Sequence, residues 1–89
     1  MISNRDIFEA ITREINRATD MHGPINGLHE GYAIILEEFE EFWDEVKKKQ
    51  KERHQADWVK ELIEVAAMCV RTIQDVTEVD TLEQALRKY

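Results

Sequence analysis

Six carboxylates lie within twelve residues of the sequence, in the segment ILEEFEEFWDEV at positions 35–46. Acidic side chains three or four residues apart on a helix repel one another by roughly 0.2–0.5 kcal/mol per pair. A helical wheel drawn at about 100° per residue places four of these acids within one arc of the helix: Glu37, Glu38, Glu41 and Glu45. Of the four, Glu38 and Glu45 border the apolar face. A bound cation would offset this crowding, so the segment predicts a metal site.

A second acidic pair, Glu61 and Glu64, lies in the segment KELIEV at positions 60–65. It has the same i,i+3 spacing as Glu38 and Glu41, and Glu61 also borders the apolar stripe of its helix. If the two segments form antiparallel helices, four carboxylates converge, which is strongly unfavourable without a cation. The alternative is a solvated acidic face, because glutamate is a good helix former. Nearby lysines would then neutralise these acids: Lys47, Lys48 and Lys60.

The ligand types indicate which metal would bind. Oxygen ligands alone favour a hard cation, Mg²⁺ with Mn²⁺ as a possible substitute. A di-iron helical bundle requires Glu-x-x-His motifs, and none of the three histidines has a glutamate three residues before it. One cysteine and scattered histidines disfavour zinc. The glycine loop G-x-x-x-x-G-K-[ST] that binds phosphate is also missing from the sequence.

Two basic residues flank the second acidic pair and are candidates to bind substrate. Lys60 and Arg71 can each meet phosphate oxygens from this helix. The alternative for both is a salt bridge to Glu64 or Asp75 on the same helix, the commoner role of an exposed basic residue beside an acid.

Helix breakers are confined to one segment, which indicates an all-α fold. All three glycines and the only proline lie in GPINGLHEG at positions 23–31, so we expect the main loop there. Apolar residues recur at helical spacing elsewhere, and the expected helices cover about residues 4–20, 29–50 and 55–77, with a short fourth helix from Asp80. We therefore predict two long antiparallel helices, flanked by an N-terminal helix and a short C-terminal helix.

Local signals support the helix starts and the core faces. Ser3 with Asp6, and Asp80 with Glu83, have the spacing of capping pairs. The third helix carries a long apolar stripe: Trp58, Leu62, Val65, Cys69, Ile73 and Val76. We expect Cys69 to be buried in this stripe as a small apolar residue. The aromatic residues Phe39, Trp43 and Trp58 are expected in the core or at a subunit interface.

Length and charge bound the class of protein. The 89 residues predict one domain spanning positions 1–89, and a chain this small covers its wide apolar faces poorly. We therefore expect oligomerisation, as a homodimer or homotetramer, to complete a helical bundle. The net charge of −7 argues against nucleic-acid or anionic-membrane partners and suits a cation-binding protein. Neither a secretory signal nor an apolar run of about 20 residues is visible, so we expect a cytoplasmic protein.

Taken together, HEGYAIILEEFEEFWDEV and KELIEVAA resemble the MazG-like all-α nucleoside triphosphate pyrophosphohydrolases. That family carries E-E-x-x-E on one helix and E-x-x-D on the next. Here the first motif is Glu37-Glu38-x-x-Glu41 and the second is Glu61-x-x-Glu64, with nineteen residues between Glu41 and Glu61. Glu64 stands where the family usually has aspartate. With the later segment TLEQALRK, the resemblance covers about residues 28–88.

The resemblance implies an activity: Mg²⁺-dependent hydrolysis of a nucleoside or deoxynucleoside triphosphate between the α and β phosphates, giving a monophosphate and pyrophosphate. It implies that Glu38, Glu41, Glu61 and Glu64 hold the metal and that Glu37 and Glu38 act in catalysis. Lys60 and Arg71 remain the candidate substrate-binding residues. The alternative is a non-catalytic helical module that binds metal or another protein, a degenerate member of the family in which Glu64 replaces the usual aspartate.

Overall fold

The computed structural model describes residues 1–78 and 80–89, and all regular structure within those ranges is helical. The elements are α1 (Asn4–His22), α2 (Leu28–Lys47), the 3₁₀ turn η1 (Gln50–Glu52), α3 (Gln55–Val76) and α4 (Thr81–Leu86). The predicted all-α class, with two long helices between an N-terminal and a short C-terminal one, is confirmed. Across the described residues, each helix is too short or too polar to cross a membrane.

Helix α1 begins and ends with capping interactions. The Ser3 hydroxyl accepts a hydrogen bond from the Asp6 amide at 3.1 Å, as the capping signal predicts. At the other end, Gly23 has a φ of 72° and its N–H donates to the Thr19 carbonyl at 2.8 Å. Glycine occupies this left-handed region without steric cost. The helix therefore runs two residues past the expected end at position 20.

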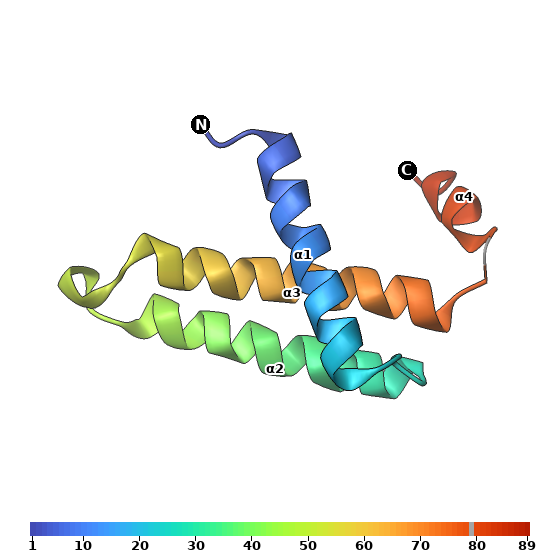
Figure 1. Ribbon diagram of the computed structural model, residues 1–89, viewed down its shortest axis with the longest axis horizontal. Coiled ribbons are helices and arrows are strands. Elements are labelled where there is room, and N and C mark those ends of the chain that lie inside the picture. The colour runs from blue at the N-terminus through green and yellow to red at the C-terminus, as the bar shows by residue number, and fades with distance from the viewer. Residues whose placement is uncertain (79) are drawn as a thin grey trace.

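Helices α2 and α3 lie side by side and antiparallel, joined through η1 (Figure 1). The expectation that α2 continues to position 50 is wrong, because the backbone becomes extended at Lys48, with φ −63° and ψ 149°. The Arg53 guanidinium donates to the Val46 carbonyl at 2.6 Å and so satisfies one acceptor of the last turn. The basic run that begins at Lys47 suits a helix C-terminus, but lysines are also good helix formers, so the run does not indicate the exact residue at which α2 ends.

Helix α3 is central, since α1 and α2 each pack against it. Figure 1 shows α1 crossing the α2–α3 hairpin. The buried centre of the contact consists of Ala18 from α1 with Ala67 and Met68 from α3. Four partly buried isoleucines surround it: Ile11, Ile15, Ile34 and Ile35. Small residues at the crossing let the backbones approach, which fixes where α1 sits over the hairpin.

A buried glycine sets the spacing between α2 and α3. A Cβ atom at Gly31 would lie 2.6 Å from Cγ2 and 2.8 Å from Oγ1 of Thr72 on α3. The Thr72 hydroxyl is itself held by a 2.8 Å hydrogen bond to the Met68 carbonyl. Only glycine leaves room for this approach, so the start of α2 is pressed closely against α3.

The C-terminal helix differs from its prediction at its start. The expected capping by Asp80 is wrong: no side-chain capping bond forms, and Asp80 has helical dihedrals of φ −86° and ψ −4°. A capping residue normally has extended dihedrals that aim its side chain at the first turn. Within the described residues, α4 packs against no other helix, and Figure 1 shows it standing away from the hairpin.

Much apolar surface on the long helices is uncovered. The prediction that Cys69 is buried is wrong, because the side chain is exposed. The apolar stripe of α3 is wider than the surface that α1 and α2 cover. On α2, Leu28 at the first position is also exposed, and so are four apolar residues that follow it at helical spacing: Tyr32, Leu36, Phe39 and Trp43. We call these four residues the α2 stripe.

Candidate metal centre

Four carboxylates from the two arms of the hairpin converge at one place. Glu38 and Glu41 come from α2, and Glu61 and Glu64 come from α3. Each offers one oxygen atom, and these four oxygens all lie within 4.8 Å of one another. The antiparallel pairing brings the two i,i+3 pairs face to face, the arrangement expected from their spacing. We call these four residues the carboxylate cluster.

Two oxygens of the cluster are buried without a hydrogen-bond partner among the described residues: Glu38 Oε2 and Glu61 Oε2. Burying ionised oxygens without compensation is costly. The spread of 4.8 Å is close to the roughly 4.2 Å between opposite ligands of an octahedral Mg²⁺, which is twice its bond length. The cluster therefore fits a hard divalent cation in ligand type, in size and in unmet charge.

Proton affinity in the cluster departs from ordinary carboxylate behaviour. Burial, followed by hydrogen bonding and repulsion from Glu64 and Glu41, raises the pKa of Glu38 to about 8. Burial and the negative charge of Glu64 raise the pKa of Glu61 to about 7. Burial alone would also raise the pKa of Glu64, but hydrogen bonds from Lys60 and Glu38 lower it. Without a metal, protons therefore take over part of the charge compensation.

The two basic candidates have different environments. Lys60 forms the predicted ion pair, with Nζ 2.9 Å from Glu64 Oε1. Arg71 forms no ion pair with Glu64 or Asp75 in the part of the chain that the structure describes, so that alternative is wrong for Arg71. It is buried, 2% exposed, and donates to the Gly23 carbonyl and the Met68 sulfur. Asp75 accepts instead from the Ile25 amide at 2.9 Å.

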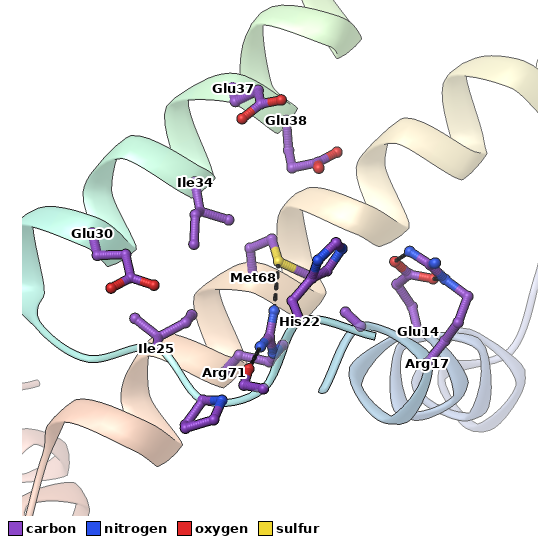
Figure 2. A pocket seen from close by; sticks show the side chains of 13 residues that line it. Glu14, Arg17, His22, Ile25, Glu30, Ile34, Glu37, Glu38, Met68 and Arg71 are labelled. Carbon is purple, nitrogen blue, oxygen red and sulfur yellow. Dashed lines mark hydrogen bonds and ion pairs between the residues drawn. The ribbon is translucent and has the colours of Figure 1, made fainter. Parts of the chain in front are cut away.

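Glu37 lies next to the cluster but outside it. Its side chain is exposed, and together with Glu38 it lines a cavity of about 360 Å³ between α2 and the end of α1. This volume falls within the roughly 300–1,000 Å³ typical of small-molecule sites. Its lining also includes the buried residues Ile25 and Arg71 and the half-buried Ile34, and Figure 2 shows the cavity from close by.

The sequence did not predict that α1 contributes to this region. Glu14, Arg17 and His22 all line the cavity, and Figure 2 shows Glu14 and Arg17 projecting from α1. The Arg17 guanidinium donates from Nε and Nη2 to both carboxylate oxygens of Glu14, at 2.7 and 2.6 Å. In the sequence this pair has only the i,i+3 spacing of an ordinary surface salt bridge. No sequence signal indicates where α1 crosses the hairpin.

No protein-family model, curated protein or solved structure matches this chain. The likeness to the MazG-like pyrophosphohydrolases therefore rests on the two acidic motifs and their flanking residues.

Proposed function

We propose that the protein is a Mg²⁺-dependent nucleoside triphosphate pyrophosphohydrolase that cleaves between the α and β phosphates, with Mn²⁺ as an alternative metal. The convergence of Glu38, Glu41, Glu61 and Glu64 within 4.8 Å carries this proposal. The buried, unpartnered oxygens of Glu38 and Glu61 support a cation rather than a solvated acidic face. The resemblance to the MazG-like family supplies the reaction and the substrate class.

The proposed reaction divides roles between the cluster and its neighbours. A bound Mg²⁺ neutralises phosphate oxygens and makes nearby water more acidic. The water oxygen attacks the α phosphorus, the bond from that phosphorus to the bridging oxygen breaks, and pyrophosphate leaves with this oxygen. Glu37 or Glu38 accepts the proton of the attacking water, because the two carboxylates lie side by side at the cavity. Lys60 and Arg71 remain candidates for binding the substrate.

Two isosteric substitutions test the cluster. Glu41→Gln or Glu61→Gln should abolish pyrophosphate release from a panel of nucleoside triphosphates in Mg²⁺ or Mn²⁺, while circular dichroism shows unchanged helix content. Stability without metal should stay level or rise, because each change removes mutual repulsion. Glu40→Gln is the matched control, since Glu40 is exposed on the same helix outside the cluster. Equal behaviour of Glu41→Gln and Glu40→Gln would refute the site.

Assembly of copies is part of the proposal. Phe39 and Trp43 in the α2 stripe are each 54% exposed, and Tyr32 is 66% exposed. A stripe of this length on one helix is unusual for a surface that stays in water. A homodimer or homotetramer would bury it and complete the helical bundle.

The same stripe favours a second candidate function, a non-catalytic interaction module that presents this apolar face to a partner. The two candidates differ in what Mg²⁺ does to stability. An enzyme with a metal-binding cluster gains about 2.7 kcal/mol at a hundredfold excess of metal over its Kd. A pure interaction module keeps the same melting temperature when Mg²⁺ is added, which thermal unfolding with and without the metal measures directly.

A further inference from the structure

Two pockets flank the carboxylate cluster, and one ion pair forms a wall of both. The cavity of about 360 Å³ described above reaches the cluster at Glu38. A second pocket, of about 490 Å³, reaches it at Glu64 and is also lined by Lys60 and Ile63. Glu14 and Arg17 of α1 line both pockets. A ligand that extends from the cluster into either pocket therefore passes this ion pair.

The two pockets differ in chemistry. The first is lined by more acids than bases: four glutamates, Glu14, Glu30, Glu37 and Glu38, face Arg17 and Arg71 beside apolar residues that include Ile25 and Met68. The second brings together two cations, Arg17 from α1 and Lys60 from α3, beside Glu64. Lys60 is now paired with Glu64, and a divalent ion that takes the Glu64 oxygen would release the ammonium group for another anion. The second pocket therefore suits the anionic end of a ligand.

The Arg17 guanidinium has donors that suit phosphate, and Glu14 occupies them in this structure. Two N–H groups of the guanidinium donate to the two carboxylate oxygens of Glu14. The Arg17 side chain is 51% exposed, whereas that of Glu14 is 14% exposed. The hydrogen bond and the charge of Glu14 raise the pKa of Arg17, and the cluster residues Glu64 and Glu38 add to this effect. A planar guanidinium with parallel donors recognises a phosphate group as it recognises a carboxylate.

We infer that Arg17 and Lys60 form a subsite for the diphosphate portion of the substrate, on the α1–α3 side of the carboxylate cluster. Arg17 exchanges its contact with Glu14 for phosphate oxygens when this portion binds. The identity of the ligand rests on the proposed function. The subsite itself rests on the geometry of α1, which lies outside the region of the family resemblance.

Opposite effects of two substitutions in the same ion pair test the subsite. The probe is inorganic pyrophosphate, titrated calorimetrically into the whole chain in the presence of Mg²⁺. Arg17→Gln should weaken binding by about tenfold or more, equivalent to ~1.4 kcal/mol. Glu14→Gln should leave binding unchanged or tighten it, because it frees the guanidinium and removes a negative charge. A merely structural ion pair predicts equal losses for both variants, and that result would overturn the subsite.

Further variants separate the subsite from folding and from general charge. Arg13→Gln removes the same charge from α1, but Arg13 lines a different pocket with Phe8 and Thr12, so pyrophosphate affinity should change by less than about twofold. Arg17→Gln could destabilise the fold by leaving the Glu14 carboxylate unpaired. The double variant Glu14→Gln/Arg17→Gln removes that unpaired charge and should still bind pyrophosphate weakly. Arg17→Gln should also strengthen Mg²⁺ binding without pyrophosphate, because it removes a cation near the cluster.

The outcomes distinguish this inference from the proposed function. If Mg²⁺ alone fails to bind but pyrophosphate binding depends on Arg17, the proposed function fails and the subsite stands. If the protein hydrolyses nucleotides but Arg17→Gln and Arg13→Gln weaken pyrophosphate equally, the function stands and the subsite is wrong. Absence of pyrophosphate binding to the unsubstituted protein also overturns the subsite.

Discussion

At the scale of single residues, the four acids of the carboxylate cluster differ in how readily they hold a proton. Glu38 and Glu61 carry the raised pKa values, about 8 and about 7, and within the cluster they are also the two acids with a buried oxygen that has no hydrogen-bond partner among the described residues. Glu64, paired with Lys60, has a lowered pKa. Glu38 and Glu61, which form no ion pair among the described residues, therefore hold protons when metal is absent, and a divalent ion would have to displace those protons to bind.

The metal-free protein should lose stability as the pH rises from about 5 to about 8. An unfolded glutamate has a pKa of about 4.3, so over this interval the folded state binds more protons than the unfolded state. The free energy of unfolding then decreases with increasing pH, because its slope follows the protons bound by the unfolded state minus those bound by the folded state. Urea denaturation in a chelator at several pH values measures the trend.

The double variant Glu38→Gln/Glu61→Gln is the control for this prediction, since it removes both shifted groups and should flatten the pH dependence. Mg²⁺ affinity of the unsubstituted protein should rise over the same pH interval, as metal replaces protons. A metal-free stability that increases between pH 5 and pH 8 would contradict the assignment of the raised pKa values to Glu38 and Glu61.

At the scale of helices, the apolar repeat in the sequence predicts where a helix lies better than it predicts which contacts the helix makes. The bounds of α3, Gln55–Val76, agree with the predicted 55–77 almost residue for residue, because apolar residues recur at helical spacing along the whole segment. The buried residues of α3 are nevertheless Ala67, Met68 and Arg71, which lie outside the predicted stripe. The exact end of α2 could not be predicted, since a hydrogen bond from Arg53, beyond the end of the helix, satisfies the Val46 carbonyl there. The convergence of the cluster followed from spacing on adjacent helices. The contribution of Arg17 did not, because a crossing site depends on tertiary packing.

Gly31→Ala tests the close approach of α2 and α3. Alanine favours a helix by about 1 kcal/mol over glycine, but its Cβ would lie 2.6 Å from Thr72 Cγ2. Threonine is stiff at χ1, and overpacking costs about 1–3 kcal/mol. We therefore expect a net loss in the free energy of unfolding of up to about 2 kcal/mol, measured by chemical denaturation.

The double variant Gly31→Ala/Thr72→Ala should recover part or all of the loss, because it removes the clashing methyl group. Recovery beyond the sum of the two single effects is the expected sign of direct contact. If Gly31→Ala alone stabilises the protein, helix propensity outweighs the contact and α2 does not depend on glycine for its spacing.

At the scale of the whole molecule, few apolar residues are fully buried in the core and many are exposed to solvent. The buried core is small and is centred on Ala18, Ala67 and Met68, whereas the α2 stripe faces outward. A chain of this length is stabilised only modestly by its own core. Association through the α2 stripe would add buried area without altering the hairpin that holds the carboxylate cluster.

Charge placed in the α2 stripe should prevent assembly. The double variant Phe39→Glu/Trp43→Glu should sediment as a monomer where the unsubstituted protein sediments as a dimer or tetramer, because buried unpaired carboxylates are costly at an interface. Glu40→Gln, on the solvent side of the same helix, should leave the sedimentation coefficient unchanged. A stable monomer of the unsubstituted protein at high micromolar concentration would rule out this assembly.

Because α4 packs against no other helix within the described residues, deuterium uptake by its amides should report whether a second copy of the chain covers it. Within the described residues this six-residue helix packs against no other, and Leu82 and Leu86 on it are 58% and 61% exposed. A helix of this length is marginal without tertiary support. In a single chain its amides should take up deuterium about as fast as those of an unstructured peptide. If deuterium uptake is slow in residues 81–86 and in the α2 stripe, these two segments form the surface that contacts a second copy of the chain.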